Sequence, residues 1–313
     1  MKNKYAWASI TRSCTNFGNY LIEYNLKKVL SDKGFGKPSF VFDAFKKLPK
    51  QEIDKINSLD FVIVPGCTTL STRHYPGTID LLQNTNLPVF NLGATFFGSP
   101  RKSSVSIISK YQQPIGTRDP VSDKFLRDNG IKTKFIGCPT LFFGNKKSCQ
   151  ISDVKRIGLV FGLKRKNTQV QIMNRLLRDK YNIASIVQEK HQEQILNKLN
   201  VKTYKYSPEN LLKVINKSDV MITGRLHATL PALVNGAPVI FLNFFDDSRF
   251  SLLDYIGLEM HTVKKGLVEE IPRILNKQSI DNLCQSVDYK KISLLRSSFS
   301  DYIDWVKKQT ASL

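Results

Sequence analysis

The chain is short of acidic residues, of closely spaced cysteines and of long apolar runs. Its five cysteines, which are Cys14, Cys67, Cys138, Cys149 and Cys284, lie far apart. They form no CxxC pair and no cluster with histidines at metal-ligand spacing. The sequence therefore predicts neither a disulfide framework nor a structural zinc site, and free thiols indicate a reducing compartment.

No apolar run is long enough to indicate a membrane-spanning helix or a secretion signal. The most apolar stretch, 226–245, is interrupted by His227, Pro231, Asn235, Pro238 and Asn243. The N-terminal residues MKNKYAWASITRS hold no apolar stretch of signal-peptide length. We therefore expect a cytoplasmic protein without a transmembrane segment.

The scarcity of acidic residues leaves a large positive charge. The 47 Lys and Arg outnumber the 26 Asp and Glu, which gives a net charge of +21. Lysines are spread along the chain, and the densest run is Lys164-Arg165-Lys166. Such a charge favours binding of anionic small substrates or peripheral contact with the inner face of a membrane. It could instead reflect only a Lys-rich composition without a functional role. No nucleic-acid-binding motif is present, so we expect no nucleic-acid partner.

Short runs rich in Val, Ile and Phe alternate with helical patterns along the whole chain. The predicted strands are Ser39–Phe42, Phe61–Val64, Val89–Leu92, Ile115–Gly116 and Phe135–Ile136, then Ile157–Phe161, Ile183–Val187, Val220–Thr223 and Val239–Leu242. This alternation predicts an α/β fold with parallel sheets covered on both faces. The polar stretch 144–154 marks a boundary between two Rossmann-like domains, 1–150 and 151–313, the second ending in a C-terminal helix. Two such domains would form an interdomain cleft, and the ligands of such sheets bind at the carboxyl ends of strands.

The strongest candidate site is the segment Thr223-Gly224-Arg225-Leu226-His227, which follows a predicted strand and opens a helix. Gly224 permits a sharp turn or a close approach to a ligand, and a helix N-terminus attracts anions. Arg225 and His227 are two residues apart, so both side chains could face one ligand. A guanidinium beside an imidazole suits proton transfer on an anionic substrate, although both could instead cap preceding carbonyls.

Other strand ends carry weaker candidates. Asp119 is a natural helix cap, whereas Arg118 before it has no such structural duty. We therefore predict that Arg118 is a cation that faces the cleft. The turn that holds Asn16, Gly18 and Asn19 suits exposed backbone donors. The remaining candidates are Lys164 and Arg165 as cations from the second half, Arg249 after another strand, His74 as a surface histidine or a ligand, and Asp246 and Asp247 as caps or metal ligands.

At these residues the chain resembles the polysaccharide pyruvyl transferases. The resemblance lies in Arg118-Asp119-Pro120-Val121-Ser122, in 219–228 (DVMITGRLHA) and in Gly236-Ala237-Pro238-Val239-Ile240, and it runs over most of 10–260. It implies a GT-B-like pair of Rossmann-type domains without a nicotinamide or an obligatory metal. It also implies transfer of pyruvate from phosphoenolpyruvate to two hydroxyls of one sugar, as a cyclic ketal with release of phosphate.

By this resemblance Arg225 and His227 match the family's donor-binding Arg and His, and the backbone of Leu226 lies near the donor. We expect His227 to transfer protons, Arg225 and Arg118 to hold phosphate and carboxylate, and Lys164 or Arg165 to close over the donor. The first domain would then bind the acceptor, a sugar or lipid-linked precursor, and the second the phosphoenolpyruvate.

The sequence also departs from the family. Pro65-Gly66-Cys67-Thr68 stands where the family usually has a run of glycines, and Arg249 stands where a Lys is common. Two other functions therefore stay open: a nucleotide-sugar glycosyltransferase, with Asp246 or Asp247 binding a ribose, and a glycan-binding protein without catalysis.

Overall fold

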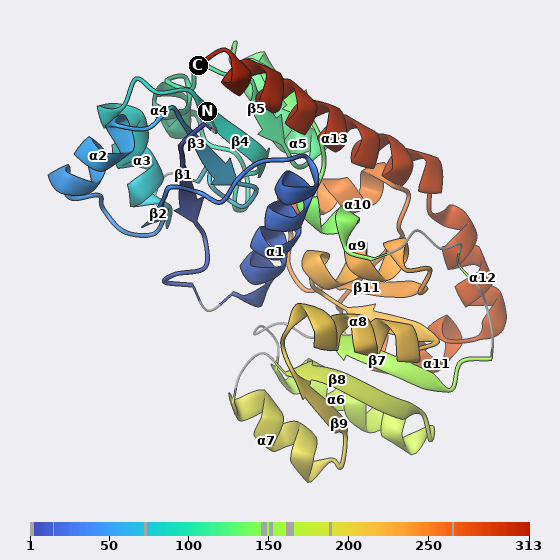
Figure 1. Ribbon diagram of the computed structural model, residues 1–313. Coiled ribbons are helices and arrows are strands. Elements are labelled where there is room, and N and C mark those ends of the chain that lie inside the picture. The colour runs from blue at the N-terminus through green and yellow to red at the C-terminus, as the bar shows by residue number, and fades with distance from the viewer. Residues whose placement is uncertain are drawn as a thin grey trace. The chain divides into compact units, whose positions relative to one another are not determined.

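The computed structural model describes residues 3–14, 16–71, 74–144, 149, 153–160, 166–187, 190–264 and 266–313. Its contacts divide the chain into two compact units (Figure 1). Unit 1 comprises Met1–Leu141, Asp247–Tyr255 and Lys290–Leu313, and unit 2 comprises Phe142–Asp246 and Ile256–Tyr289. The division thus differs from one boundary at 150, because two later segments belong to unit 1.

Unit 1 is built on a parallel sheet of six strands in the order β2-β1-β3-β4-β5-β6. The strands are β1 (Tyr5–Ser9), β2 (Phe40–Asp43), β3 (Phe61–Pro65), β4 (Val89–Ala94), β5 (Ile115–Thr117) and β6 (Thr133–Phe135). The helices are α1 (Phe17–Asp32), α2 (Lys50–Asn57), α3 (Pro76–Asn84), α4 (Val105–Ile108), α5 (Pro120–Asp128), α10 (Ser251–Tyr255) and α13 (Tyr289–Ala311), with the 3-10 turns η2 (Lys102–Ser104), η3 (Pro139–Phe142) and η4 (Ser248–Phe250). The order of strands reverses between β1 and β3, which makes that point the switch point of this sheet.

The C-terminal helix α13 packs along unit 1 through aromatic side chains (red in Figure 1). Trp305 meets Phe90 of β4 edge to face with ring centroids 5.8 Å apart. The hydroxyl of Tyr302 donates to the carbonyl of Pro114 at 2.5 Å. Since both aromatic rings cover the unit 1 sheet, the last helix is part of that unit's core rather than an appendage of unit 2.

Unit 2 is also built on a parallel sheet of six strands, in the order β12-β11-β10-β7-β8-β9. The strands are β7 (Arg156–Val160), β8 (Asn182–Val187), β9 (Lys202–Lys205), β10 (Val220–Thr223), β11 (Val239–Asn243) and β12 (Met260–Thr262). The helices are α6 (Lys166–Arg178), α7 (Lys190–Lys198), α8 (Pro208–Lys217), α9 (Leu226–Val234), α11 (Leu267–Ile274) and α12 (Lys277–Ser286). The switch point of this sheet lies between β7 and β10.

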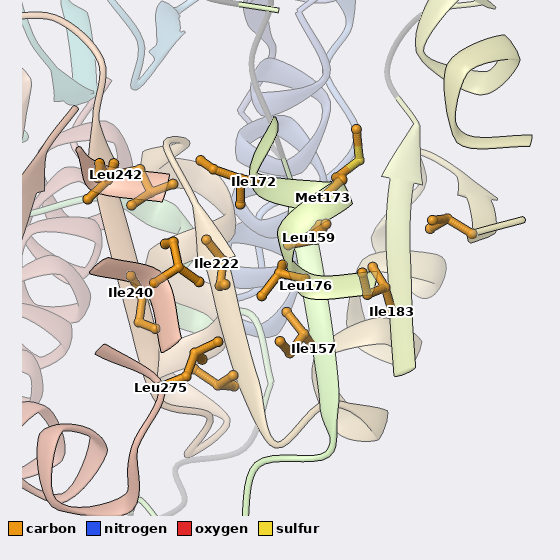
Figure 2. Close-up of a cluster of buried hydrophobic side chains, with 14 of the residues drawn as sticks. Ile157, Leu159, Ile172, Met173, Leu176, Ile183, Ile222, Ile240, Leu242 and Leu275 are labelled. Carbon is orange, nitrogen blue, oxygen red and sulfur yellow. The ribbon is translucent and has the colours of Figure 1, made fainter. Parts of the chain in front are cut away.

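The core of unit 2 lies between this sheet and its helices (Figure 2). Ile172, Met173 and Leu176 recur at helical spacing on α6 and pack with Ile157 and Leu159 of β7. All five side chains are almost completely buried. Residues on both faces of the strands are apolar, as expected for a parallel sheet covered by helices.

One sequence-based expectation is wrong. Cys149 and Cys284 form a disulfide with their Cα atoms 6.0 Å apart, across a sequence separation of 135 residues. Cys14, Cys67 and Cys138 are free thiols. Spacing along the chain could not reveal this bridge, because the fold brings a segment after unit 1 to helix α12.

Candidate functional site

The predicted Thr223–His227 segment lies at the switch point of the unit 2 sheet. Thr223 ends β10, and its hydroxyl donates to the carbonyl of Val160, the last residue of β7, at 2.6 Å. The same hydroxyl accepts the backbone N–H of Arg225 at 3.0 Å. This pair of hydrogen bonds fixes the turn between two neighbouring strand ends, where ligands of doubly wound sheets bind.

Gly224 is required at this turn by close packing. A β-carbon at this position would lie 2.7 Å from Cδ2 of Phe244 and 2.8 Å from the carbonyl oxygen of Leu242. The residue thus lets the turn approach β11 and the residues that follow it. The sequence had suggested a sharp turn or an approach to a ligand, and the structure shows an approach to the neighbouring strand.

Helix α9 begins directly after the turn and presents its N-terminus there. Arg225 is the N-cap in extended conformation, and its carbonyl accepts the N–H groups of Ala228 and Thr229 at 3.0 Å each. The first turn holds no acidic residue to neutralise the positive end of the helix dipole. Leu226 is buried, whereas Arg225 and His227 are both partly exposed. A guanidinium, an imidazole and a helix N-terminus therefore lie together at one strand end.

Tyr206 is a neighbour of Arg225 that the sequence analysis did not single out. It follows β9, and Ser207 after it caps α8 by accepting the N–H of Asn210 at 3.1 Å. Burial raises the pKa of the Tyr206 phenol, and the nearby charge of Arg225 opposes that rise. The phenol is therefore protonated at neutral pH. The sequence could have indicated Tyr206 as a site residue. Like Arg118, it stands between the end of a strand and the residue that caps the next helix.

The turn with Asn16, Gly18 and Asn19 lies at the switch point of the unit 1 sheet. Asn16 is the N-cap of α1 and accepts the N–H of Gly18 at 3.1 Å. The buried amide of Asn19 donates to the carbonyl of Ile10 at 3.0 Å and accepts from the thiol of Cys67 at 3.1 Å. The two carboxamides hold the turn rigid, and their binding of substrate stays a prediction.

A buried polar cluster occupies the end of β3, where the chain departs from the family pattern. The hydroxyl of Tyr75 lies 3.0 Å from both the Cys67 thiol and the Thr68 hydroxyl. Burial raises the pKa of Tyr75, with smaller contributions from Cys67. A β-carbon at Gly66 would lie 2.1 Å from the carbonyl oxygen of Leu92, so this one glycine is needed for packing on β4.

Asp119 caps helix α5, as the sequence predicted. Its carboxylate accepts the N–H of Ser122 at 2.9 Å and a short hydrogen bond from the hydroxyl of Thr95. Burial raises the pKa of Asp119, and its hydrogen bonds and the charge of Arg118 partly oppose the rise. Arg118 itself is fully buried, beside Asp119 and Cys138. Its role in substrate binding stays a prediction.

Arg249 is engaged by a neighbour on its own segment. Its guanidinium donates to Asp247 from Nε at 2.7 Å and from Nη2 at 2.5 Å. Asp247 also caps η4 by accepting the N–H of Arg249 at 3.0 Å, and its side chain is buried. Asp247 is thus committed to an ion pair and a cap, while Asp246 is exposed.

The predicted residues fall into two groups. Unit 2 holds Gly224, Arg225, Leu226 and His227, and unit 1 holds Asn16, Gly18, Asn19, Arg118 and Arg249. Lys164 and Arg165 lie outside the described residues. Within the described ranges, no three His, Cys, Asp or Glu side chains gather to hold a metal ion. In the same ranges, no helix combines the length and the apolar character that a membrane span requires.

Solved structures share the fold of the whole chain. A Listeria monocytogenes protein called a UDP-N-acetylglucosamine 2-epimerase superposes with a TM-score of 0.65 at 14% identity, covering 100% of this chain and 98% of that one. The UDP-GlcNAc 2-epimerase of Neisseria meningitidis, bound to UDP-GlcNAc, gives 0.60 at 14% identity, covering 98% and 100%. MurG of Acinetobacter baumannii gives 0.55 at 12% identity, covering 98% and 100%. These likenesses confirm the predicted α/β fold with two Rossmann-like domains, of the kind found in GT-B proteins.

Comparison of the sequence identifies the family more specifically than comparison of the fold does. No curated protein is significantly similar to the chain. The model of the polysaccharide pyruvyl transferase family, however, matches residues 16–244, which include the Asn16 turn, the Arg118-Asp119 cap and the Arg225–His227 turn. Because this match spans well over half of the 313 residues, the chain belongs to the polysaccharide pyruvyl transferase family.

Proposed function

We propose that the protein transfers pyruvate from phosphoenolpyruvate to two hydroxyls of one sugar, forming a cyclic ketal and releasing phosphate. The observation that carries this proposal is the place of Arg225 and His227 at the switch point of the unit 2 sheet. Unit 2 is accordingly the side that binds phosphoenolpyruvate, and unit 1 the side that binds the acceptor. Family membership supports a pyruvyl transferase, and the chemistry below supports this donor.

Phosphoenolpyruvate carries a phosphate and a carboxylate close together, so its site needs converging positive charge. The N-terminus of α9 supplies N–H donors and the positive end of a helix dipole. Arg225 adds a planar fork that matches either acidic group of the donor. Tyr206, whose phenol stays protonated beside Arg225, is a further hydrogen-bond donor in this part of the unit. Lys164 and Arg165 stay proposed as additional cations.

His227 is the proposed proton carrier. Its imidazolium gives a proton to the methylene carbon of phosphoenolpyruvate, and the adjacent carbon gains oxocarbenium character. The oxygen of the first sugar hydroxyl bonds to that carbon, and its proton returns to His227. The second hydroxyl then attacks the same carbon, the C–O bond to phosphate breaks, and the phosphate leaves with the electron pair. The proton of the second hydroxyl passes to the phosphate, so no group outside the site is consumed.

The test is acceptor-dependent release of phosphate from phosphoenolpyruvate, with the ketal detected by mass spectrometry of the sugar. We expect His227→Gln, which cannot act as an acid near neutral pH, to lower kcat by roughly 10²- to 10⁴-fold. We expect Arg225→Lys, which keeps the charge but loses the fork, to raise the KM for phosphoenolpyruvate. His261→Gln in β12 is the matched control, since this histidine of unit 2 lies outside the turn.

The same samples separate the competing functions. Thermal stabilisation by phosphoenolpyruvate supports the proposal. Stabilisation by a uridine nucleotide alone would instead indicate a nucleotide-sugar glycosyltransferase. The ion pair of Asp247 with Arg249 leaves Asp246, which is exposed, as the carboxylate that could bind a ribose in that alternative. If the protein binds sugar but neither phosphoenolpyruvate nor the nucleotide stabilises it, it is a glycan-binding protein and the proposal is overturned.

We further propose that the protein works in the cytoplasm beside the inner face of the membrane, where Cys149 and Cys284 would be kept as two thiols. The net charge of +21 supports attraction to anionic lipids, where lipid-linked sugar precursors would be found. Sedimentation with vesicles containing anionic lipid tests this part. Binding should weaken as salt is raised, and equal sedimentation with neutral vesicles would contradict it.

A further inference from the structure

One aromatic side chain of unit 1 is exposed at the end of a central strand without an evident role in folding. Phe97 follows β4, and 50% of its surface is exposed. Of the phenylalanines in the described ranges, it is the one that is exposed. Leaving such a ring in water forfeits the free energy of its burial. Single exposed apolar side chains are common on protein surfaces, so what distinguishes Phe97 is the set of contacts that fixes it.

Three contacts fix Phe97, one at its backbone and two at its ring. Its backbone N–H donates to the hydroxyl of Ser71 at 2.6 Å. The guanidinium carbon of Arg249 lies over the ring, 5.0 Å from its centroid. The imidazole of His74 meets the ring edge to face, with centroids 5.6 Å apart and planes at 83°. An exposed ring fixed in this way is organised before any ligand arrives.

The contacts of Arg249 are themselves fixed. Asp247 accepts hydrogen bonds from both Nε and Nη2 of its guanidinium, and these bonds hold the cation over the ring of Phe97. The neighbouring Ser248 donates a short hydrogen bond to the carbonyl of Gly98, next to the aromatic ring. The loop after β3, the loop after β4 and the η4 segment therefore meet at one place, all within unit 1.

This arrangement has the chemistry of a sugar subsite. The face of an aromatic ring is electron-rich and attracts the polarised C–H groups that a pyranose presents on one side. The hydroxyls at the rim of a pyranose need hydrogen-bonding groups nearby, and the exposed imidazole of His74 supplies one. A few polar groups around an apolar surface are typical of small-molecule sites.

We propose that Phe97, His74 and Arg249 form a subsite that stacks on one pyranose ring of the acceptor glycan. Phe97 is the platform, His74 contacts the hydroxyls at the rim, and Arg249 positions the platform. The inference rests on the proposed function for the identity of the ligand as the acceptor. The binding of a pyranose at Phe97 is nevertheless measurable without phosphoenolpyruvate.

The experiment is saturation-transfer NMR with methyl glycosides of galactose, mannose and N-acetylmannosamine, with affinities from titration. We expect Phe97→Ala to weaken binding of the preferred glycoside by roughly 2- to 13-fold, which corresponds to the about 0.5–1.5 kcal/mol that aromatic contacts contribute beyond the area they bury. Phe97→Tyr keeps the ring and should bind as the wild type does. His74→Ala should change which glycoside is preferred. Tyr24→Ala, which removes an aromatic residue of α1 that is 45% exposed, is the matched control.

Unchanged affinity in Phe97→Ala would overturn the subsite. So would an equal loss of melting temperature and affinity in Phe97→Ala and Phe97→Tyr, because that pattern indicates packing instead of stacking. The two proposals fail differently. If the wild type binds glycosides through Phe97 but does not use phosphoenolpyruvate, the proposed function is wrong and the subsite stands. If phosphoenolpyruvate is used and Phe97→Ala keeps the wild-type acceptor KM, the subsite is wrong.

Discussion

Replacing Gly224 by alanine should disable the candidate site by moving it rather than by removing a functional group. The new β-carbon would lie 2.7 Å from Cδ2 of Phe244 and 2.8 Å from the backbone oxygen of Leu242. Ordinary carbon contacts begin near 3.4 Å, so the turn must retreat by about 0.7 Å from residues that include a strand backbone. The overpacking should cost about 1–3 kcal/mol of the free energy of unfolding.

The displacement should reduce activity beyond this loss of stability. Arg225 follows Gly224 directly and His227 lies two residues further along. Misplacing a reacting group by about 1 Å costs roughly 10²-fold in rate. We therefore expect kcat/KM of folded Gly224→Ala to fall by about tenfold or more. The assays are acceptor-dependent phosphate release and urea denaturation, measured at a temperature where the variant is folded.

Gly158→Ala is the matched control, because it overpacks the same sheet away from the turn. Its β-carbon would lie 2.3 Å from Sδ of Met221 and 2.6 Å from Oγ of Ser218, and Gly158 lies in the middle of β7. It should lower stability while kcat/KM of the folded protein stays near that of the wild type. Wild-type kcat/KM in Gly224→Ala, or an equal loss in Gly158→Ala, would refute the link between the turn and activity.

Three further predictions concern stability. Asp119→Ala removes a cap and a buried hydrogen-bond acceptor, so the free energy of unfolding should fall by about 1–3 kcal/mol, measured by urea denaturation, with a smaller loss in Asp119→Asn. Burial by itself would raise the pKa of Asp219, but hydrogen bonds from the Arg156 side chain and from the backbone N–H groups of Lys155 and Arg156 outweigh it and hold the pKa below its usual value. These bonds therefore stabilise the fold above the unfolded-state pKa, and the benefit is lost as pH falls through the lower folded-state pKa. Asp219→Asn should lower the free energy of unfolding at pH 7 and make it depend less on pH in the acid range, and an unchanged pH dependence would contradict this. The bridge between Cys149 and Cys284 closes a loop of 135 residues, worth up to roughly 5 kcal/mol by chain entropy, so a reductant should lower the melting temperature of the wild type and leave Cys284→Ser unaffected.

Several of the elements were visible in the sequence because their signals are local. The apolar runs Phe61–Val64 and Val220–Thr223 are almost the strands β3 and β10, since parallel strands buried on both faces are continuously apolar. The helix cap at Asp119 could also be predicted, because capping depends on neighbouring residues alone. Strand β1, with the sequence YAWAS, was missed because alanine and serine carry little strand preference, although all five residues are buried in the sheet.

Other features depend on contacts between residues far apart in the chain, and only the tertiary structure decided them. The sequence placed Arg225 and His227 at a strand end before a helix, but the order of strands in the sheet made that end a switch point. The burial of Arg118, the ion pair that occupies Arg249 and the disulfide of Cys149 all needed the fold to bring their partners together. The physical reason is the distance along the chain over which each feature is decided. Hydrophobic periodicity and helix capping involve residues a few positions apart, whereas side-chain burial, ion pairs and disulfides depend on how distant segments pack.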